Sequence, residues 1–113
     1  MRTDNTAPSV VTVTYRYTDD VTARDRVLPE HRDYLRALAD EGVLLVAGPY
    51  APGEPRGALL VFRADKAQVA AVLRNDPFTG KGVLATTEIV AWEPVIGTAV
   101  AALQPASEGK ETP

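Results

Sequence analysis

The sequence has 113 residues, of which 45% are hydrophobic and 24% are charged, with a net charge of −3 and no cysteine. These values fit one small globular domain, and they exclude disulfides, cysteine-held metal centres and thiolate nucleophiles. Acidic and basic residues are mixed without a Lys/Arg cluster, so no nucleic-acid partner is expected. No apolar run approaches the roughly 20 residues that span a bilayer, and the start lacks the apolar centre of a secretory signal. We therefore expect a cytoplasmic protein with no membrane partner.

The first predicted element is a strand over residues 10–17, where apolar side chains alternate with threonine and arginine. Residues 1–9 before it are polar and predict a flexible N-terminal extension. A helix follows: Pro29 suits its first position, Glu30 suits the positive first turn, and Gly42 gives a stop signal. Its expected buried stripe has helical spacing and consists of Tyr34, Leu35, Leu38 and Ala39.

Two apolar runs of strand type come next, at residues 43–47 and 58–62. Gly48 and Pro49 end the first run, and a loop rich in proline and glycine joins it to the second. The short connection predicts a β-hairpin.

A second helix is expected after Asp65, because Asp65 and Gln68 have the spacing of a capping box. The helix must stop near Asp76, since a residue that precedes proline is pushed out of the α region. A last strand covers residues 83–92. The buried stripe of this helix is Val69, Val72 and Leu73.

This order, β-α-β-β-α-β, predicts an α+β, ferredoxin-like domain over residues 10–97, with two helices on one face of a four-stranded antiparallel sheet. We expect the helices to run parallel to each other. Residues 98–113 are first Ala-rich and then rich in Pro, Ser, Glu and Lys, so they predict a largely disordered C-terminal tail.

The sheet face away from the helices is expected to be apolar as well, because both alternating sets of side chains in the strands are apolar. One set points to the helices; the other set contains Leu44, Val46, Leu59, Val61, Leu84, Val90 and Trp92. A contiguous apolar patch of this kind marks an interface, so a homodimer is predicted. The alternative is that residues 95–103 fold under the sheet.

His31 and Asp76 are the candidate catalytic residues. His31, the only histidine, falls at the centre of the first helix's stripe, and Asp76 continues the stripe of the second helix. Histidine titrates near neutral pH and suits general acid/base work, but a packed histidine bonded to a carbonyl fits the pattern too. Asp76 either has a specific buried partner or turns out to solvent. In parallel helices, the two residues meet only if the helices are offset.

Gly48, Pro49 and Phe78 are candidates for substrate binding. Gly48 and Pro49 allow a ligand close to the backbone, although ordinary turn chemistry more often explains such a pair. Phe78 lines a pocket or belongs to the core. One histidine and no cysteine leave only carboxylates, which lack metal-ligand spacing, so neither a metal site nor a cofactor is predicted.

Together the motifs resemble the YciI-like (YCII-related) family from about residue 11 to residue 95. The first half carries Tyr15-Arg16-Tyr17, Arg26-x-x-Pro29-Glu30-His31-Arg32-x-Tyr34-Leu35 and Gly42-Val43-Leu44-Leu45-x-x-Gly48-Pro49. The second half carries Gly57-Ala58-Leu59-Leu60-Val61-Phe62, Asn75-Asp76-Pro77-Phe78, Glu88-Ile89 and Trp92.

The resemblance implies a ferredoxin-like chain that pairs into a dimeric α/β barrel, similar in fold to muconolactone isomerase. It implies a His–Asp dyad at His31 and Asp76, and we expect an acidic pocket where sheet and helices meet. One kind of member is a dehydrochlorinase acting on a chlorinated hydroxyquinol. This predicts a cofactor-independent lyase or isomerase for a small ring or enolisable substrate. A non-catalytic ligand-binding module and a barrel monooxygenase remain as alternatives.

Overall fold

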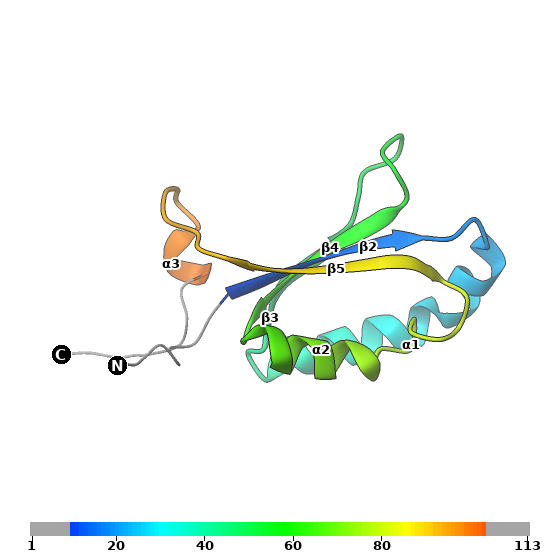
Figure 1. Cartoon of the computed structure of the whole chain (residues 1–113), viewed down its shortest axis with the longest axis horizontal. Coiled ribbons are helices and arrows are strands. Elements are labelled where there is room, and N and C mark those ends of the chain that lie inside the picture. The colour runs from blue at the N-terminus through cyan, green and yellow to red at the C-terminus, as the bar shows by residue number, and fades with distance from the viewer. Residues whose placement is uncertain (1–9, 104–113) are drawn as a thin grey trace.

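The computed structural model describes residues 10–103 and has the α+β, ferredoxin-like order expected from the sequence (Figure 1). The strands form one antiparallel sheet in the order β3-β4-β2-β5, and α1 and α2 cover one of its faces. Residues 1–9 and 104–113 lie outside the described part, so their expected flexibility stays a prediction. Residues 98–103 of the expected tail are described and include a short helix. The elements are β2 (Val10–Tyr17), α1 (Val21–Asp40), β3 (Leu44–Pro49), β4 (Gly57–Arg63), α2 (Lys66–Arg74), β5 (Leu84–Trp92) and α3 (Val100–Leu103).

The core lies between the sheet and the two helices. Alternate residues of the central strand β2, Val11, Val13 and Tyr15, are fully buried, as the period of two predicts. Val69 and Leu73 from α2 are buried against them. No helix in the described range is long and apolar enough to cross a membrane.

Helix α1 begins at Val21, so the prediction that it starts at Pro29 was wrong. Asp20 is the N-cap, and its Oδ1 accepts a hydrogen bond from the backbone N–H of Ala23 at 2.9 Å. Pro29 lies inside the helix, where it removes one backbone donor. The added turns bury Ala23 and Val27 on the face that carries His31. His31 therefore lies near the middle of a 20-residue helix rather than near its start.

The expected stripe on α1 is only partly correct. Leu38 is buried, whereas Tyr34 and Leu35 are half-buried and Ala39 is exposed. The longer helix explains the shift, because its contacts with the sheet include turns that precede Pro29.

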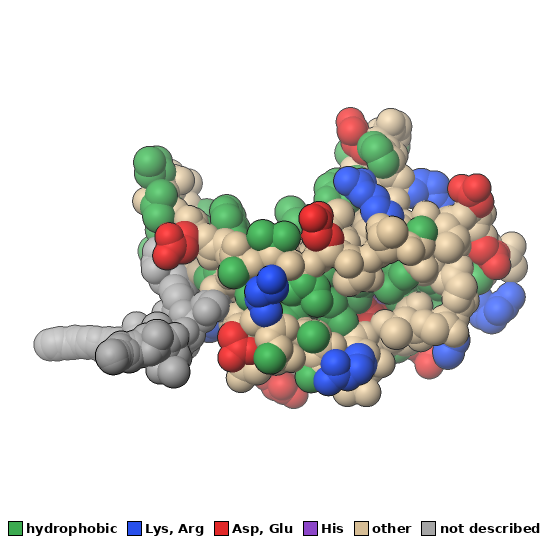
Figure 2. All heavy atoms as spheres, in the orientation of Figure 1, with side chains coloured by type: hydrophobic (Ala, Val, Ile, Leu, Met, Phe, Trp, Pro, Cys, Tyr) green, Lys and Arg blue, Asp and Glu red, His purple; other side chains and the backbone are tan. Residues whose placement is uncertain are grey.

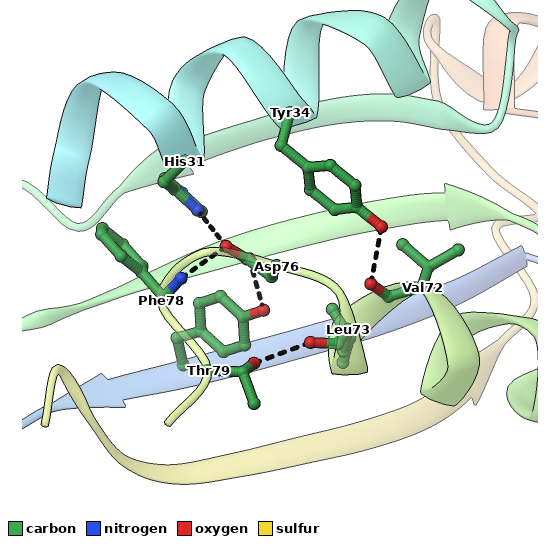
Figure 3. Close-up of polar contacts among 8 residues, drawn as sticks. His31, Tyr34, Val72, Leu73, Asp76, Phe78 and Thr79 are labelled. Atoms are coloured by element: carbon green, nitrogen blue, oxygen red, sulfur yellow. Dashed lines mark hydrogen bonds and ion pairs between the residues drawn. The ribbon is translucent and has the colours of Figure 1, made fainter. Parts of the chain in front are cut away.

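The two helices run antiparallel, which corrects the expectation that they are parallel. Each helix returns against the direction of the strand before it, and β2 and β4 are themselves antiparallel (Figure 1). Helix α2 has nine residues and α1 has twenty, about 13 Å and 30 Å at 1.5 Å per residue. The C-terminal end of α2 therefore lies beside the middle of α1, where His31 projects (Figure 3).

Helix α2 begins as predicted. The Asp65 side chain accepts a hydrogen bond from Gln68 N at 2.8 Å, and Gln68 Oε1 accepts one from Asp65 N at 3.0 Å. This reciprocal pair is the capping box expected from the spacing.

Two register shifts alter the expected sheet faces. Between Leu44 and Val46 the pairing of β3 with β4 shifts, so Leu44 lies opposite Phe62 on the helix side and is buried. A second shift pairs Leu84 with Tyr17, and Leu84 packs against the core. Leu44 and Leu84 therefore do not belong to the open face. Strand β3 continues through Gly48 to Pro49, and an edge strand tolerates the missing N–H of proline.

The open face of the sheet is nevertheless apolar. Four of its side chains are between 41% and 55% exposed: Val46, Leu59, Val90 and Trp92. Figure 2 shows hydrophobic side chains along this side, between the β3–β4 hairpin and the segment before α3. Val95 and Ile96 stay 71% and 92% exposed, so they do not cover it. Helix α3 contacts the end of β4, where Arg63 donates a hydrogen bond to the Ala102 carbonyl oxygen at 3.4 Å.

Candidate active site

The turn after α2 fixes Asp76 in the interior. The backbone N–H of Asp76 donates to the Leu73 carbonyl oxygen at 3.2 Å, and Thr79 N–H donates to the Asp76 carbonyl oxygen at 2.8 Å. The Thr79 hydroxyl also donates to the Leu73 carbonyl oxygen, at 2.7 Å (Figure 3). The Asp76 side chain is fully buried, so it does not turn out to solvent.

Three donors converge on the Asp76 carboxylate. Oδ1 lies 2.8 Å from His31 Nδ1 and accepts from Phe78 N–H at 2.9 Å (Figure 3). Oδ2 accepts from the Tyr15 hydroxyl at 2.8 Å. A buried carboxylate needs several such hydrogen bonds to offset its lost hydration. The arrangement suits an ionised carboxylate, which only accepts hydrogen bonds.

His31 is held on two sides. Its ring stacks on Phe78 with 3.7 Å between centroids and 6° between planes. Because Nδ1 points to a carboxylate, Nδ1 carries the hydrogen and Nε2 has the free lone pair in the neutral ring. In the described part of the chain, Nε2 has no hydrogen-bond partner. The predicted contact between His31 and Asp76 is therefore present, and the alternative in which a carbonyl satisfies His31 is not.

Tyr15 is the member of this cluster that the sequence reading did not single out. Burial, followed by the charge of Asp76 and the hydrogen bond to it, raises the pKa of Tyr15 above its ordinary value of 10.0. Tyr15 therefore remains a donor at physiological pH. Its place on the inward face of β2 was visible in the alternation, but nothing in the sequence pointed to a carboxylate partner 61 residues away.

A cavity of about 110 Å³ borders His31, between α1 and the sheet. Its helix side is a stripe of α1, and its sheet side carries the small side chains Ala47 and Ala58. Since Nδ1 faces Asp76, the ring edge that carries Nε2 is the edge left for the cavity. The full lining is Tyr17, Arg24, Leu28, His31, Arg32, Leu35, Ala47, Gly48, Pro49, Ala58 and Leu60.

This cavity is basic, which corrects the expectation of an acidic pocket. Arg24 and Arg32 line it and no Asp or Glu side chain does. Asp76, the buried acid beside His31, is covered by His31, Tyr15 and Phe78. Burial raises the pKa of the Tyr17 hydroxyl, and the nearby Arg24 charge opposes that shift.

The comparison with known families fits this geometry. The model of the YCII-related domain matches residues 9–93. The chain belongs to the YCII-related domain family. The resemblance drawn from the sequence motifs is thereby confirmed. No match was found among the curated proteins.

Solved structures similar to this YCII-related chain include a dehydrochlorinase. This is the 5-chloro-2-hydroxyhydroquinone dehydrochlorinase TftG from Burkholderia phenoliruptrix AC1100, in complex with 2,5-dihydroxybenzoquinone. It is 26% identical, with a TM-score of 0.58, and the match covers 73% of this chain and 92% of that one.

Two further structures share the fold of this YCII-related chain. PA3566 from Pseudomonas aeruginosa is 11% identical with a TM-score of 0.54, covering 80% of this chain and 96% of that one. An antibiotic biosynthesis monooxygenase is 17% identical with a TM-score of 0.50, covering 77% and 98%. At these identities the likeness concerns the fold alone.

The other predicted site residues fall in two places. Gly48 and Pro49 line the cavity beside His31, although a Cβ on Gly48 would meet no atom within 4 Å. Gly48 lies opposite Leu59 in register, so that Cβ would point to the open face of the sheet. Phe78 is fully buried and is not part of the lining; its ring supports the imidazole. In the described range of this YCII-related chain, no group of three or more His, Cys, Asp or Glu side chains is arranged to hold a metal.

Proposed function

We propose that the protein is a cofactor-independent enzyme that uses His31 and Asp76 for general acid/base proton transfer on a small ring or enolisable substrate. One observation carries the proposal: a buried carboxylate binds one nitrogen of the only histidine, at 2.8 Å, while the ring borders a cavity. A base that is fixed in one orientation beside a cavity is what proton transfer requires.

In this mechanism, the Nε2 lone pair of His31 removes a proton from the substrate. The Asp76 carboxylate stabilises the imidazolium that forms and keeps Nδ1 protonated throughout. Phe78 restricts ring rotation by stacking, and Tyr15 and the Phe78 N–H hold the carboxylate in place. Returning the proton to another atom of the substrate completes an isomerisation.

Elimination is the reaction that the likeness to the dehydrochlorinase supports. A proton passes from the substrate to His31 Nε2, the electron pair left behind forms a new π bond, and chloride leaves with the electrons of the carbon–chlorine bond. The imidazolium then gives its proton to water. The overall change is loss of HCl, which needs no oxidant or reductant.

A non-catalytic ligand-binding module is the second candidate. The observation in its favour is the tight enclosure of His31, which is 6% exposed beside a cavity of about 110 Å³. A small molecule bound in this cavity without turnover would contact the same lining residues as a substrate.

The working form that we propose is a homodimer closed through the open sheet face, as a dimeric α/β barrel. The support is the apolar patch of Val46, Leu59, Val90 and Trp92, which the rest of the described chain leaves exposed. Isologous contact between two such faces buries the same patch on both copies.

The test is chloride release from 5-chloro-2-hydroxyhydroquinone by the purified protein, followed with and without added metal or flavin. Wild-type protein should turn over unaided, and His31→Gln should lower the rate by about 10²–10⁴-fold. Asp33→Asn is the matched control, because Asp33 is 81% exposed on the same helix and should keep the wild-type rate. Turnover that survives in His31→Gln would remove the base from the proposal. Binding without turnover would favour the ligand-binding module, and oxygen uptake would favour a monooxygenase.

A further inference from the structure

The cavity beside His31 has a positively charged residue at its other end. Arg24 lies seven residues before His31, so both side chains project from the same face of α1, about 10 Å apart along the helix. Leu28 lies between them and lines the cavity as well. A single molecule of ring size placed along this stripe faces the imidazole at one end and the guanidinium at the other.

Arg24 is placed to bind a ligand. Its side chain is only 24% exposed, and its guanidinium lies 5.5 Å from the centre of the Tyr17 ring. Its guanidinium donates a hydrogen bond to Asp25 at 3.0 Å, a carboxylate that is itself 61% exposed, and the Tyr17 hydroxyl is a second hydrogen-bonding neighbour. Such an exposed ion pair contributes little. A guanidinium has five N–H donors, so further donors remain for a ligand.

Two hollows meet at Arg24. The His31 cavity and a neighbouring space of about 240 Å³ share Tyr17, Arg24 and Pro49 as lining. The neighbouring space is formed by the β3–β4 loop and adds Arg56, with Glu54 as its acidic residue. The local charge at the junction is therefore positive, and low exposure strengthens its attraction for an anion.

We propose that Arg24 determines specificity, and that it selects planar ring substrates that carry an oxyanion: a phenolate, enolate or ring carboxylate. This assignment names the substrate class of the His31 site, so the role of Arg24 in turnover rests on the proposed function. The oxyanion binds Arg24, and the ring carbon or hydroxyl that loses its proton lies at His31 Nε2.

The walls of the cavity favour a flat ligand. Leu28 and Leu35 on the helix face Ala47 and Ala58 on the sheet. A ring placed between these two layers would have aliphatic side chains on both of its faces, the apolar lining typical of small-molecule sites.

The experiment compares two probes that share one ring. One is 2,5-dihydroxybenzoquinone, whose acidic hydroxyls are ionised at neutral pH, and the other is the uncharged 2,5-dimethoxybenzoquinone. Their Kd values are measured by calorimetry on wild-type protein, Arg24→Gln and the control Arg36→Gln. Arg36→Gln removes the same charge from the same helix. Arg36 is 71% exposed, pairs with a neighbouring aspartate as Arg24 does, and does not line the cavity.

Wild-type protein should bind the anionic probe at least about tenfold more tightly than the neutral one, the effect of one charge-assisted hydrogen bond. Arg24→Gln should lose about tenfold for the anion, with little change for the neutral probe, and Arg36→Gln should match wild type. Any of three results would overturn the proposal: equal loss in both arginine variants, no loss in Arg24→Gln, or a wild type that binds both probes equally or binds neither. Because binding is measured without turnover, a failure of the acid/base proposal shows itself separately, in the chloride-release assay.

Discussion

Replacing Asp76 by alanine should cost far more stability than replacing it by asparagine. The alanine variant leaves His31 Nδ1–H, the Tyr15 hydroxyl and the Phe78 N–H without their acceptor. Tyr15 is fully buried and His31 is 6% exposed, so water does not readily replace the carboxylate. The asparagine variant keeps the shape, and its amide oxygen still accepts from His31 and Phe78 while the Tyr15 hydroxyl rotates to accept from the amide nitrogen.

The magnitude follows from those three contacts. An orphaned buried donor costs about 1–3 kcal/mol, so three of them give roughly 3–9 kcal/mol. Removing the carboxylate also removes its own desolvation penalty, and one-sided removal of a buried pair costs about 3–5 kcal/mol in total. We therefore expect a loss of about 3–5 kcal/mol for Asp76→Ala and about 1–2 kcal/mol for Asp76→Asn.

Urea unfolding at one fixed protein concentration measures both losses, since any oligomer makes stability depend on concentration. Asp33→Ala is the control, because its 3.4 Å pair with Arg36 is exposed and its removal should change stability by less than about 0.5 kcal/mol. If Asp76→Ala were as stable as Asp76→Asn, the three hydrogen bonds would not be what holds this cluster together.

Three further predictions concern the strands. Gly57→Ala should destabilise the fold by about 2 kcal/mol or more, because its Cβ would collide with the Tyr15 carbonyl oxygen, whereas Gly48→Ala meets no atom and should be neutral in the same urea assay. Tyr15 has a raised pKa in the folded state, so above pH 10 the unfolded chain loses a proton that the folded chain keeps. Tyr15 alone should lower stability there by up to about 1.4 kcal/mol per pH unit, so the decline should be less steep in Tyr15→Phe. Light scattering should give about twice the 12.1 kDa chain mass, and Leu59→Asp on the open face should give a monomer; a monomeric wild type would contradict the dimer.

Local signals predicted most of the fold. The alternation in residues 10–17 identified the central strand, and the spacing of Asp65 and Gln68 identified the start of α2. Helical spacing placed His31 and Asp76 on buried stripes, where a polar group implies a buried partner. It did not show that the two residues meet; the family resemblance paired them.

Competing local signals explain the errors in the elements. Proline is frequent at the first position of helices, so Pro29 indicated a helix start there. The helix begins at Val21 instead, where Asp20 is an equally good cap. The shifts at Leu44 and Leu84 depend on pairing with a distant strand. Each shift moves the residues beyond it to the opposite face of the sheet. The alternation within a single strand does not reveal such a shift.

The basic character of the cavity depended on the start of α1. Once the helix begins at Val21, Arg24 and His31 share one face, and the sheet residues opposite are small. A helix that starts at Pro29 leaves Arg24 in a loop with no defined direction. The wrong start of α1 therefore left Arg24, one of the two arginines that line the cavity, without a predicted position.

The most direct test of the account is the ¹H–¹⁵N spectrum of the His31 ring, recorded with and without 2,5-dihydroxybenzoquinone. His31 is the only histidine, so both ring-nitrogen signals come from this residue, and their different couplings to the two carbon-bound ring protons distinguish Nδ1 from Nε2. The neutral His31 ring should carry its proton on Nδ1, next to Asp76, and the ligand should shift the Nε2 signal far more than the Nδ1 signal. A ring protonated on Nε2, or an Nε2 signal that does not move when the ligand is bound, would contradict a base that faces the substrate.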